Sequence, residues 1–327
     1  MNRVAEVGPL HPGMVWIPGG TFRMGSDDHY VEEKPAHTVA VDGFWMDETP
    51  VTNAQFRRFI EATGHVTWAE IDPDPRDYPG ARPEMLKAGG LVFTPPSKPV
   101  DLADWGQWWR FTFGATWRRP YGKGSHIGGL DEHPVVQVAF RDAEAYAKWA
   151  GKELPTEAEW EFAARGGLDA AEFAWGDELT PGGRHMANIW QGAFPHENTR
   201  ADGFARTSPA RTYPANGYGL FDMIGNVWEW TVDWYSARHE GDAAKACCVP
   251  DNPRGGSVEG SYDPRQTKLR IPRKVLKGGS HLCAPSYCRR YRPAARHAED
   301  VDTPTSHVGF RCIVRSETRA GLSRAGG

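Results

Sequence analysis

The stretch KGGSHLCAPSYCRRYRPAARH, residues 277–297, contains two of the five cysteines of the chain, Cys283 and Cys288. The two thiols could form a disulfide, bind a metal or take part in a reaction. A local disulfide is sterically possible, but the short loop that it closes would add little to the stability of a core this large. A zinc site would need two more ligands, and no standard zinc spacing is present. The candidate zinc ligands are three histidines, His281, His297 and His307.

The size and charge of the chain argue against several classes of protein. The 327 residues can bury a large core, and the formal net charge of -4 gives no electrostatic footprint for nucleic acid or an anionic membrane. No stretch approaches the roughly 20 apolar residues of a membrane span, and the first residues show no signal-peptide core. Five cysteines are an odd number, which is not typical of a secreted disulfide framework. We therefore expect a cytoplasmic protein.

Glycine and proline are frequent, with 37 and 26 residues, and predict that much of the backbone is turn and loop. The 14 tryptophans can supply the core of such a protein. We interpret residues 65–130 as a long packed loop, because its tryptophans would be wasteful in a disordered tether. The acidic run around Asp27, Asp28, Glu32 and Glu33 is interpreted as a solvated face.

Short strands are predicted near both ends of the chain. MVWI and TFRM, separated by Pro-Gly-Gly at residues 18–20, are typical of a hairpin. HTVAV and FWMD, separated by Asp42-Gly43, are typical of a second hairpin. Near the other end, HVGFRCIV alternates so that four apolar side chains share one face of a strand: Val308, Phe310, Cys312 and Val314.

Capping signals predict three helices. The first follows Thr52, with Gln55 at the capping-box position, and ends at Gly64. The second is capped by Asp142 and ends at Gly151, and the third runs from a Thr156–Glu159 capping box to Gly166. No linker and no repeat period are visible, so residues 1–327 are expected to form a single α+β domain.

With its flanking residues, the two-cysteine stretch resembles the formylglycine-generating enzymes, the sulfatase-modifying factors. The resemblance runs over nearly the whole chain, through GMVWIPGGTFRMGS, AGKELPTEAEWEFAARGG, NIWQGAFPHENTRADGF, NGYGLFDMIGNVWEWTVDWY, KGGSHLCAPSYCRRYRPAAR and GFRC. Most of these motifs also occur in superfamily members with other activities. The specific pattern is G-G-S-x-x-C-x-x-x-Y-C, residues 278–288, which is expected only in the oxidase branch. The resemblance implies a fold with little regular secondary structure, distantly like C-type lectins.

The resemblance also implies a reaction. These enzymes oxidise one cysteine of an unfolded or nascent sulfatase, in a C-x-P-x-R sequence, to formylglycine with O2 and a thiol reductant. Two thiolates are soft ligands that suit Cu(I), so Cys283 and Cys288 would hold copper and the substrate thiolate would join them. Ser280 and Tyr287 match family residues of the oxygen and substrate pocket, and Trp228 matches an indole packed against it. By its residue type alone, Trp228 would be interpreted as a core aromatic.

The resemblance extends to the peptide groove and to calcium. Pro120 and His307 are expected at the edges of the groove, although relatives can have Asn where His307 stands. Calcium prefers oxygen donors, and two groups of residues match family sites. If these matches did not hold, the same residues would be interpreted as turn and surface residues. The two groups are Asn188 and Asp202 with the carbonyls of Ile189 and Phe204, and Asp222 and Glu229 with the carbonyls of Gly225 and Val227.

Three cysteines remain outside the predicted site. Vertebrate relatives carry extra disulfides, but three of the four matching positions here are Ala147, an alanine in EFAARGG, and Pro293. Cys312 occupies the fourth position without a partner and is predicted to be a buried free thiol. The resemblance assigns no role to Cys247 or Cys248.

Two other functions compete with the oxidase. A sulfoxide synthase of the same superfamily usually adds a helical domain with a His-rich iron site, for which 327 residues leave no space. A lectin-like module that only binds would not need two thiols beside Ser280. The sequence therefore favours the copper-dependent oxidase.

Overall fold

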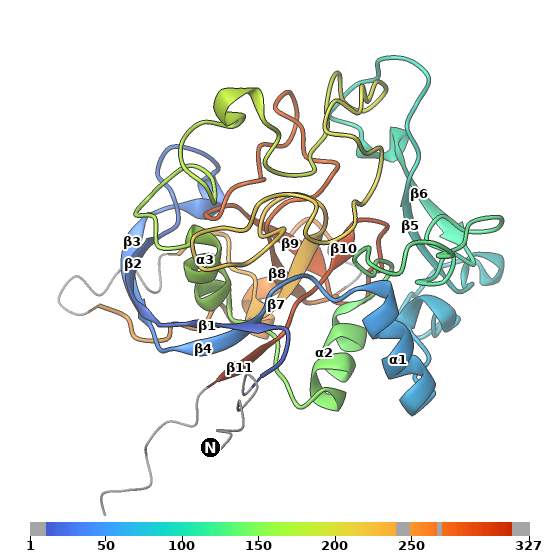
Figure 1. The fold of residues 1–327 in the computed structure, drawn as a ribbon. Helices are drawn as coiled ribbons and strands as arrows, with labels where there is room; N and C mark the ends of the chain where they lie inside the picture. Colours follow the sequence, from blue (N-terminus) through green and yellow to red (C-terminus); the bar gives the residue numbers. More distant parts are fainter. Residues whose placement is uncertain (1–10, 240–248, 267–269, 316–327) are drawn as a thin grey trace, which may run out of the picture.

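The computed structural model describes residues 11–239, 249–266 and 270–315. Within these residues, short helices and small β-sheets are joined by long turns (Figure 1), which confirms the predicted α+β class with little regular secondary structure. The helices and 3-10 helices are α1 (Asn53–Thr63), α2 (Phe140–Trp149), α3 (Glu157–Arg165), α5 (Val258–Ser261), η1 (Val31–Glu33), η2 (Trp68–Glu70), η3 (Pro83–Met85), η4 (Trp105–Gln107) and η5 (Pro181–Gly183).

The strands form a central sheet of order β10-β7-β8-β9, in which β10 is parallel to β7 and the other pairs are antiparallel. A second sheet has the order β1-β4-β11, and the pairs β2-β3 and β5-β6 form two ribbons. The strands are β1 (Met14–Ile17), β2 (Gly20–Met24), β3 (His37–Val41), β4 (Phe44–Asp47), β5 (Gly89–Phe93), β6 (Trp109–Phe113), β7 (Trp228–Trp234), β8 (Arg273–Lys277), β9 (Arg296–Asp300), β10 (Val308–Gly309) and β11 (Ile313–Arg315).

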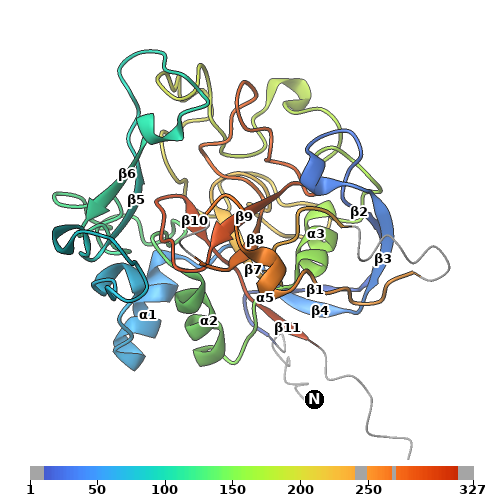
Figure 2. The ribbon, with the colours of Figure 1, turned by 180° about the vertical axis from the view of Figure 1, so that it is seen from behind.

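Helix α3 is the element around which the core is arranged. It lies between the β2-β3 ribbon and the central sheet (Figure 1), and all nine of its residues are buried. Trp160 of α3 and Trp230 of β7 are both fully buried in the same core. Helices α1 and α2 pack together at the other side of the sheet, next to the β5-β6 ribbon (Figures 1 and 2).

The first four strands lie where the sequence predicts them, but the predicted hairpins are wrong. Strand β1 pairs with β4, and β2 pairs with β3, in one register that continues from Met14 opposite Asp47 to Met24 opposite His37. The two arms form a single long hairpin that bends at its glycines. A Cβ atom at Gly19 would lie 2.6 Å from the backbone nitrogen of Gly43, so the bend requires a residue without a side chain. The Gly-rich segments therefore mark a corner, not two turns.

The capping signals are confirmed for α1 and α3. Both capping boxes are present, at Thr52 and Thr156, and each helix ends at a left-handed glycine. Helix α2 begins at Phe140, so Asp142 is not its N-cap as predicted. Instead, the Asp142 carboxylate accepts a hydrogen bond from the backbone N–H of Ala139, 3.0 Å away.

Two further predictions need correction. Residues 65–130 do not form only a packed loop, because they include the antiparallel β5-β6 ribbon. A connection of more than a dozen residues joins the two strands, so no short turn signals the hairpin. The strand predicted at 308–314 is divided between β10 and β11, which belong to different sheets. Three of the four side chains predicted to share its face, Val308, Phe310 and Cys312, are nevertheless fully buried. The fourth, Val314, is only half-buried, and Ile313 is buried in its place.

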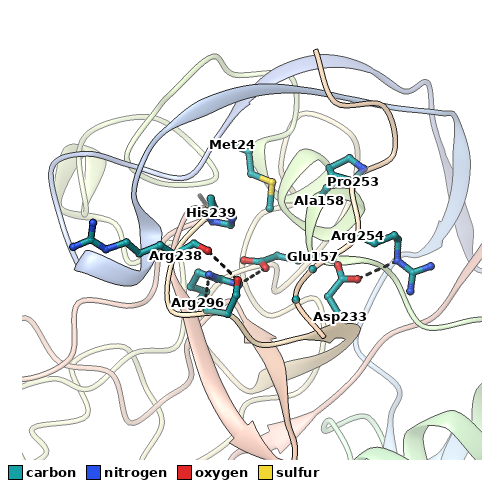
Figure 3. Close-up of a pocket in the computed structure, with 12 residues that line it drawn as sticks. Met24, Glu157, Ala158, Asp233, Arg238, His239, Pro253, Arg254 and Arg296 are labelled. Atoms are coloured by element: carbon teal, nitrogen blue, oxygen red, sulfur yellow. Dashed lines mark hydrogen bonds and ion pairs between the residues drawn. The ribbon is translucent and has the colours of Figure 1, made fainter. Parts of the chain in front are cut away.

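Buried ion pairs join the N-terminal segment and α3 to the C-terminal strands. Glu33 is fully buried, and its carboxylate accepts hydrogen bonds of 2.8 and 2.5 Å from the Arg292 guanidinium. The prediction that Glu33 lies on a solvated face is therefore wrong. From α3, Glu157 accepts a hydrogen bond from Arg296 at 2.8 Å (Figure 3). One turn later, Glu161 is paired with Lys277 at 2.9 Å.

We expect the Glu33–Arg292 pair to be essential for stability. Glu33→Ala leaves the guanidinium buried without its partner, which typically costs about 3–5 kcal/mol. Urea unfolding should show this loss as a lower midpoint. Asp28→Ala is the matched control, because Asp28 belongs to the same acidic run but is exposed. Its free energy of unfolding should change by about 0.5 kcal/mol or less. Equal effects of the two substitutions would contradict the importance of the pair.

Candidate active site

A cavity of about 240 Å³ brings together most of the residues predicted for the reaction and the peptide groove. Six of the seven residues predicted for the reaction and the peptide groove line it: Trp228, Ser280, Cys283, Tyr287, Cys288 and His307. The other lining residues are Trp108, Trp109, Phe194, Leu282, Arg290 and His297. Pro120 is the exception, since it is buried outside this lining and its carbonyl accepts a hydrogen bond from Gln137 Nε2 at 2.8 Å.

The backbone after β8 places the two cysteines. Gly279 has φ of 71°, and a Cβ atom there would lie 2.8 Å from the carbonyl oxygen of Arg290. The loop therefore folds back tightly on itself, which only glycine permits. Two local turns follow, in which Cys283 N donates to Ser280 O and Cys288 N donates to Ala284 O, each at 2.9 Å. These turns direct both thiols into the same space.

The two thiols are in contact but are not bonded. Their Sγ atoms lie 3.2 Å apart, and both cysteines are free, so the structure does not contain the disulfide considered from the spacing. The thiol of Cys283 is fully buried, which raises its pKa. The hydrogen bond from Cys283 and the positive charge of Arg290 lower the pKa of Cys288. The pair therefore favours one proton, held by Cys283, and a thiolate at Cys288.

Arg290 is a site residue that the sequence reasoning missed. Its Nη1 atom lies 3.9 Å from Cys288 Sγ, and its Nη2 donates to Glu32 Oε1 at 2.6 Å. Tyr30 packs its ring against the same guanidinium, 3.9 Å from the centroid. The prediction of a solvated face is thus also wrong for Glu32. The basic run after Cys288 was the signal that could have identified Arg290, because a cation beside a cysteine stabilises its thiolate.

Histidines surround the thiols without forming a closed metal site. His281 points to the backbone, where its Nδ1 and the carbonyl oxygen of Asn226 are 2.8 Å apart. His307 lines the cavity, and burial lowers its pKa, so it is neutral at physiological pH. In the described part of the chain, no cluster of three or more His, Cys, Asp or Glu side chains could hold a metal. The zinc alternative therefore lacks its ligands there.

Aromatic rings form the walls of the cavity. Tyr287 stacks on Phe194, with centroids 4.6 Å apart and planes nearly parallel, and Trp108 meets Tyr287 edge-on at 5.6 Å. Burial raises the pKa of Tyr287, so its hydroxyl remains a hydrogen-bond donor. Trp228 is 3% exposed and belongs to the core as well as to the cavity wall. Its position is compatible with both interpretations, and its predicted role toward substrate stays a prediction.

The first group of predicted calcium ligands lies together. The Asp202 carboxylate accepts hydrogen bonds from the backbone N–H groups of Ile189, at 3.2 Å, and Phe204, at 3.1 Å. Asn188 precedes Ile189 and donates through Nδ2 to the carbonyl of Arg206. Burial raises the pKa of Asp202, so a bound cation would offset the cost of its charge. This oxygen-only donor set fits calcium.

In the second group, Arg311 joins the carboxylate of Glu229 to the backbone of Asp222. Its guanidinium donates to both oxygens of Glu229, at 2.7 and 2.9 Å, and to the carbonyl of Asp222, at 3.2 Å. Burial raises the pKa of Asp222 to about 6. Gly225 and Val227 follow in the next few residues and would supply the remaining carbonyls. Because Arg311 already supplies a positive charge to Glu229, the first group is the stronger calcium candidate.

A second cavity, of about 230 Å³, contains none of the predicted site residues. Four of its charged side chains are already paired, Glu157 with Arg296 and Asp233 with Arg254 (Figure 3). This cavity therefore does not compete with the thiol cavity as an active site.

The remaining cysteines fall into two groups. Cys312 is a fully buried free thiol, as predicted. Cys247 and Cys248 lie outside the described residues.

Comparison with known proteins places this geometry in a family. The model of the sulfatase-modifying factor enzyme 1-like domain matches residues 3–316. The chain belongs to the sulfatase-modifying factor family. It is 54% identical over 301 residues to the formylglycine-generating enzyme of Mycobacterium tuberculosis, which covers 92% of this chain and 97% of the relative. The formylglycine-generating enzyme of Streptomyces coelicolor is 45% identical, over 94% of this chain and 91% of the relative.

The family also contains a relative named as inactive. The mouse inactive C-alpha-formylglycine-generating enzyme 2 is 36% identical, over 92% of this chain and 85% of the relative. Solved structures show the same fold at low identity. PvdO from Pseudomonas aeruginosa has a TM-score of 0.61 at 23% identity, and covers 93% of this chain and 94% of its own. Treponema denticola variable protein 1 has a TM-score of 0.56 at 18% identity, with 93% and 95% covered.

The helices of the described residues are all too short or too polar to cross a membrane. The cytoplasmic location inferred from the cysteine count stays a prediction.

We expect Arg290→Gln to shift the alkylation of Cys288 by iodoacetamide to higher pH. The substitution removes the charge that stabilises the thiolate, and mass spectrometry of the alkylated peptide would measure the rate at each pH. Arg289→Gln is the matched control, because the Arg289 side chain is paired with Glu172 at 2.7 Å instead. An unchanged alkylation profile in Arg290→Gln would contradict the electrostatic role of this guanidinium.

Proposed function

We propose that this protein oxidises a cysteine in a C-x-P-x-R sequence of an unfolded sulfatase to formylglycine, with O2 and with copper held by Cys283 and Cys288. The observation that carries the proposal is the pair of free thiols 3.2 Å apart in an aromatic-lined cavity. The relatives named formylglycine-generating enzymes support the same reaction.

The donor chemistry of the thiol pair suits copper. Two sulfur donors are soft ligands that favour Cu(I) over harder cations. Cys288 has the lowered pKa expected of a metal-binding thiol, and Cys283 can release its proton on binding. When bound, Cu(I) would supply the one-electron chemistry with O2 that amino-acid side chains lack. No other acid, cysteine or histidine of the described residues completes a cluster around the thiols, which leaves room for the substrate thiolate.

The overall reaction needs a reductant. Oxidation of the substrate thiol, R-CH2-SH, to the aldehyde, R-CHO, with release of hydrogen sulfide removes two electrons from the substrate. Reduction of O2 to water and the aldehyde oxygen takes up four electrons. Two external thiols supply the remaining two electrons and become a disulfide. The balance therefore requires the thiol reductant that the family resemblance implies.

The protein groups around the thiols bind, orient and exclude water. The stacked rings of Phe194 and Tyr287 and the indole of Trp108 form an apolar wall, which would shield the reacting atoms from solvent. Arg290 stabilises the thiolate at Cys288. Ser280 is fully buried, and its hydroxyl accepts a hydrogen bond from the backbone N–H of Leu282, so it is held in one orientation on the cavity wall.

We also propose that calcium binds at the group around Asp202, and that Asp222 forms the second site. A fold with so little regular structure is stabilised by ion cross-links between its loops. The raised pKa values of both acids support this proposal, because each carboxylate loses solvation without a full positive partner of its own.

A second candidate function is that of a non-enzymatic, lectin-like binding module, and the relative named as inactive shows that the family is not limited to active enzymes. The free thiol pair argues against it, since a binder has no use for two thiols in contact at the base of a cavity. Turnover distinguishes the two functions directly.

A peptide containing C-x-P-x-R should be converted to an aldehyde by copper-loaded protein, O2 and a thiol. The aldehyde can be trapped with a hydrazide and measured by mass spectrometry. Cys283→Ser and Cys288→Ser should each lower turnover at least about 100-fold and abolish Cu(I) binding, because a hydroxyl is a poorer ligand for Cu(I) than a thiolate. Cys312→Ser is the matched control and should retain both properties. No trappable aldehyde from the copper-loaded protein would favour the binding function instead.

Chelation of calcium should lower the melting temperature, and by more at pH 7.5 than at a pH near the ordinary pKa of an aspartate. In the calcium-free protein, the raised pKa of Asp202 makes this carboxyl stabilising below its ordinary pKa, and the contribution is lost as the pH rises through the folded pKa. Saturating calcium opposes that loss, so its removal should cost roughly 3–5 °C at pH 7.5. Calorimetry would measure the difference.

Asp202→Ala should remove most of this sensitivity to chelator, whereas Asp28→Ala, at an exposed acid, should leave it intact. Protein shown by elemental analysis to be metal-free, but with an unchanged melting temperature, would rule out a stabilising calcium site.

A further inference from the structure

An aromatic stripe leads away from the cavity along one face of β6. Trp109, Phe111 and Phe113 alternate along this strand, so their side chains point to the same side of the ribbon. Trp109 lines the thiol cavity, and its ring lies 4.8 Å from that of His307. The rings of Phe111 and Phe113 lie 5.8 Å apart. We call these three residues the aromatic stripe.

The outer two rings of the stripe are unusually exposed. Phe111 is 49% and Phe113 is 51% exposed. Opposite Phe113 on β5 lies Gly89, which has no side chain to cover the ring, and opposite Phe111 lies Leu91. Contiguous exposed aromatic groups are uncommon on a protein surface and often mark a binding site. Neither ring helps to close the core of the described residues, since both lie outside its two clusters.

The other face of the ribbon attaches it to the protein. Val92 is buried on that face, and a Cβ atom at Gly90 would lie 2.8 Å from the carbonyl oxygen of Pro304. The backbone of Leu91 also forms hydrogen bonds with Pro304 and Ser306, both 2.9 Å long. The ribbon stands at the edge of the molecule in both views (Figures 1 and 2). The aromatic stripe therefore lies on the outward face of a ribbon whose other face is packed against the protein.

We propose that the aromatic stripe binds apolar side chains of the client polypeptide, in the extended segment that flanks the cysteine to be oxidised. This inference rests on the proposed function and names a further part of the client that the protein recognises. The stripe is continuous with the thiol cavity, because Trp109 belongs to both the cavity wall and the stripe. An unfolded sulfatase exposes the apolar side chains that a folded protein would bury, which matches the chemistry of the two exposed rings.

The length of the stripe sets the spacing of the contacts. Four residue steps separate Trp109 from Phe113, or about 14 Å at about 3.4 Å per residue of a strand. An extended client segment covers the same distance in about four residues. An apolar side chain four or more residues from the cysteine should therefore reach Phe111 or Phe113. A peptide limited to the C-x-P-x-R sequence has no residue before the cysteine, and its only residue at that distance on the other side is the charged arginine, so it should not make this apolar contact.

The test compares short and extended peptides that carry serine in place of the reactive cysteine. The short peptide contains only S-x-P-x-R, and the extended peptides add two leucines, either four and six residues before the serine or six and eight residues after it. Fluorescence anisotropy gives the ratio of their dissociation constants. If the stripe buries about half of each of the two leucine side chains, the apolar surface removed from water stabilises the complex. We therefore expect one of the two extended series to bind about tenfold more tightly than the short peptide.

Phe111→Ser combined with Phe113→Ser should reduce this ratio to about one. Trp16→Ser is the matched control, because Trp16 is a comparably exposed aromatic residue, 41%, on a different sheet. It should keep the tenfold ratio. Circular dichroism and melting curves check that the double variant is folded, and Phe111→Leu with Phe113→Leu should restore most of the ratio if apolar contact is what matters.

Three results would overturn the proposal. The first is that the short and extended peptides bind the unsubstituted protein equally well, and the second is that the Ser double variant keeps the tenfold ratio of dissociation constants. The third is that the double variant changes from dimer to monomer with no effect on this ratio. The last result would identify the stripe as an interface between copies of this chain. The proposed oxidation is tested separately, by turnover of the short cysteine-containing peptide. Its failure with an intact tenfold ratio would leave the stripe as a peptide-binding surface.

Discussion

The buried ion pair between Glu33 and Arg292 fixes the loop that carries the two cysteines. A guanidinium and a carboxylate that are both removed from water must stay paired, because an isolated buried charge costs several kcal/mol. This pair joins segments 259 residues apart in the sequence. Once Glu33 is in place, its neighbours Tyr30 and Glu32 lie against Arg290. The same segment therefore holds the fold and orients the cation of the site.

Helix α3 fixes the two strands that flank the cysteine loop in a similar way. Its carboxylates Glu161 and Glu157 pair with Lys277, the last residue of β8, and with Arg296, the first residue of β9. The loop between these strands is thus anchored at both ends, by Lys277 and Arg296, and a third time by Arg292, four residues before β9 begins. Apolar side chains can often repack after a small shift of a strand at modest cost, whereas separating a buried ion pair costs several kcal/mol. In a protein with so little regular structure, such pairs position the thiols.

Local signals predicted local structure well, whereas contacts between distant segments were missed. The caps of α1 and α3 depend on residues within one helical turn, so Thr52 and Thr156 could be recognised from the sequence. The family resemblance then supplied half of the cavity lining, six of its twelve residues. The pairing of β1 with β4 was missed because the bend at Gly19 depends on contact between two distant corners. Glu32 and Glu33 were misjudged for the same reason, since their basic partners lie more than 250 positions away.

The two cysteines are chemically unequal because of where their loop ends. Cys283 comes first and is enclosed by the core, so burial disfavours its charged form. Cys288 comes at the end of the loop, beside Arg290, whose charge is in turn fixed by Glu32. The Glu32 carboxylate holds the Arg290 guanidinium, and this guanidinium stabilises the thiolate form of Cys288. The negative charge of the thiol pair therefore lies on Cys288, which is the cysteine closer to solvent. The charge state of this thiol is therefore set by a carboxylate near the opposite end of the chain.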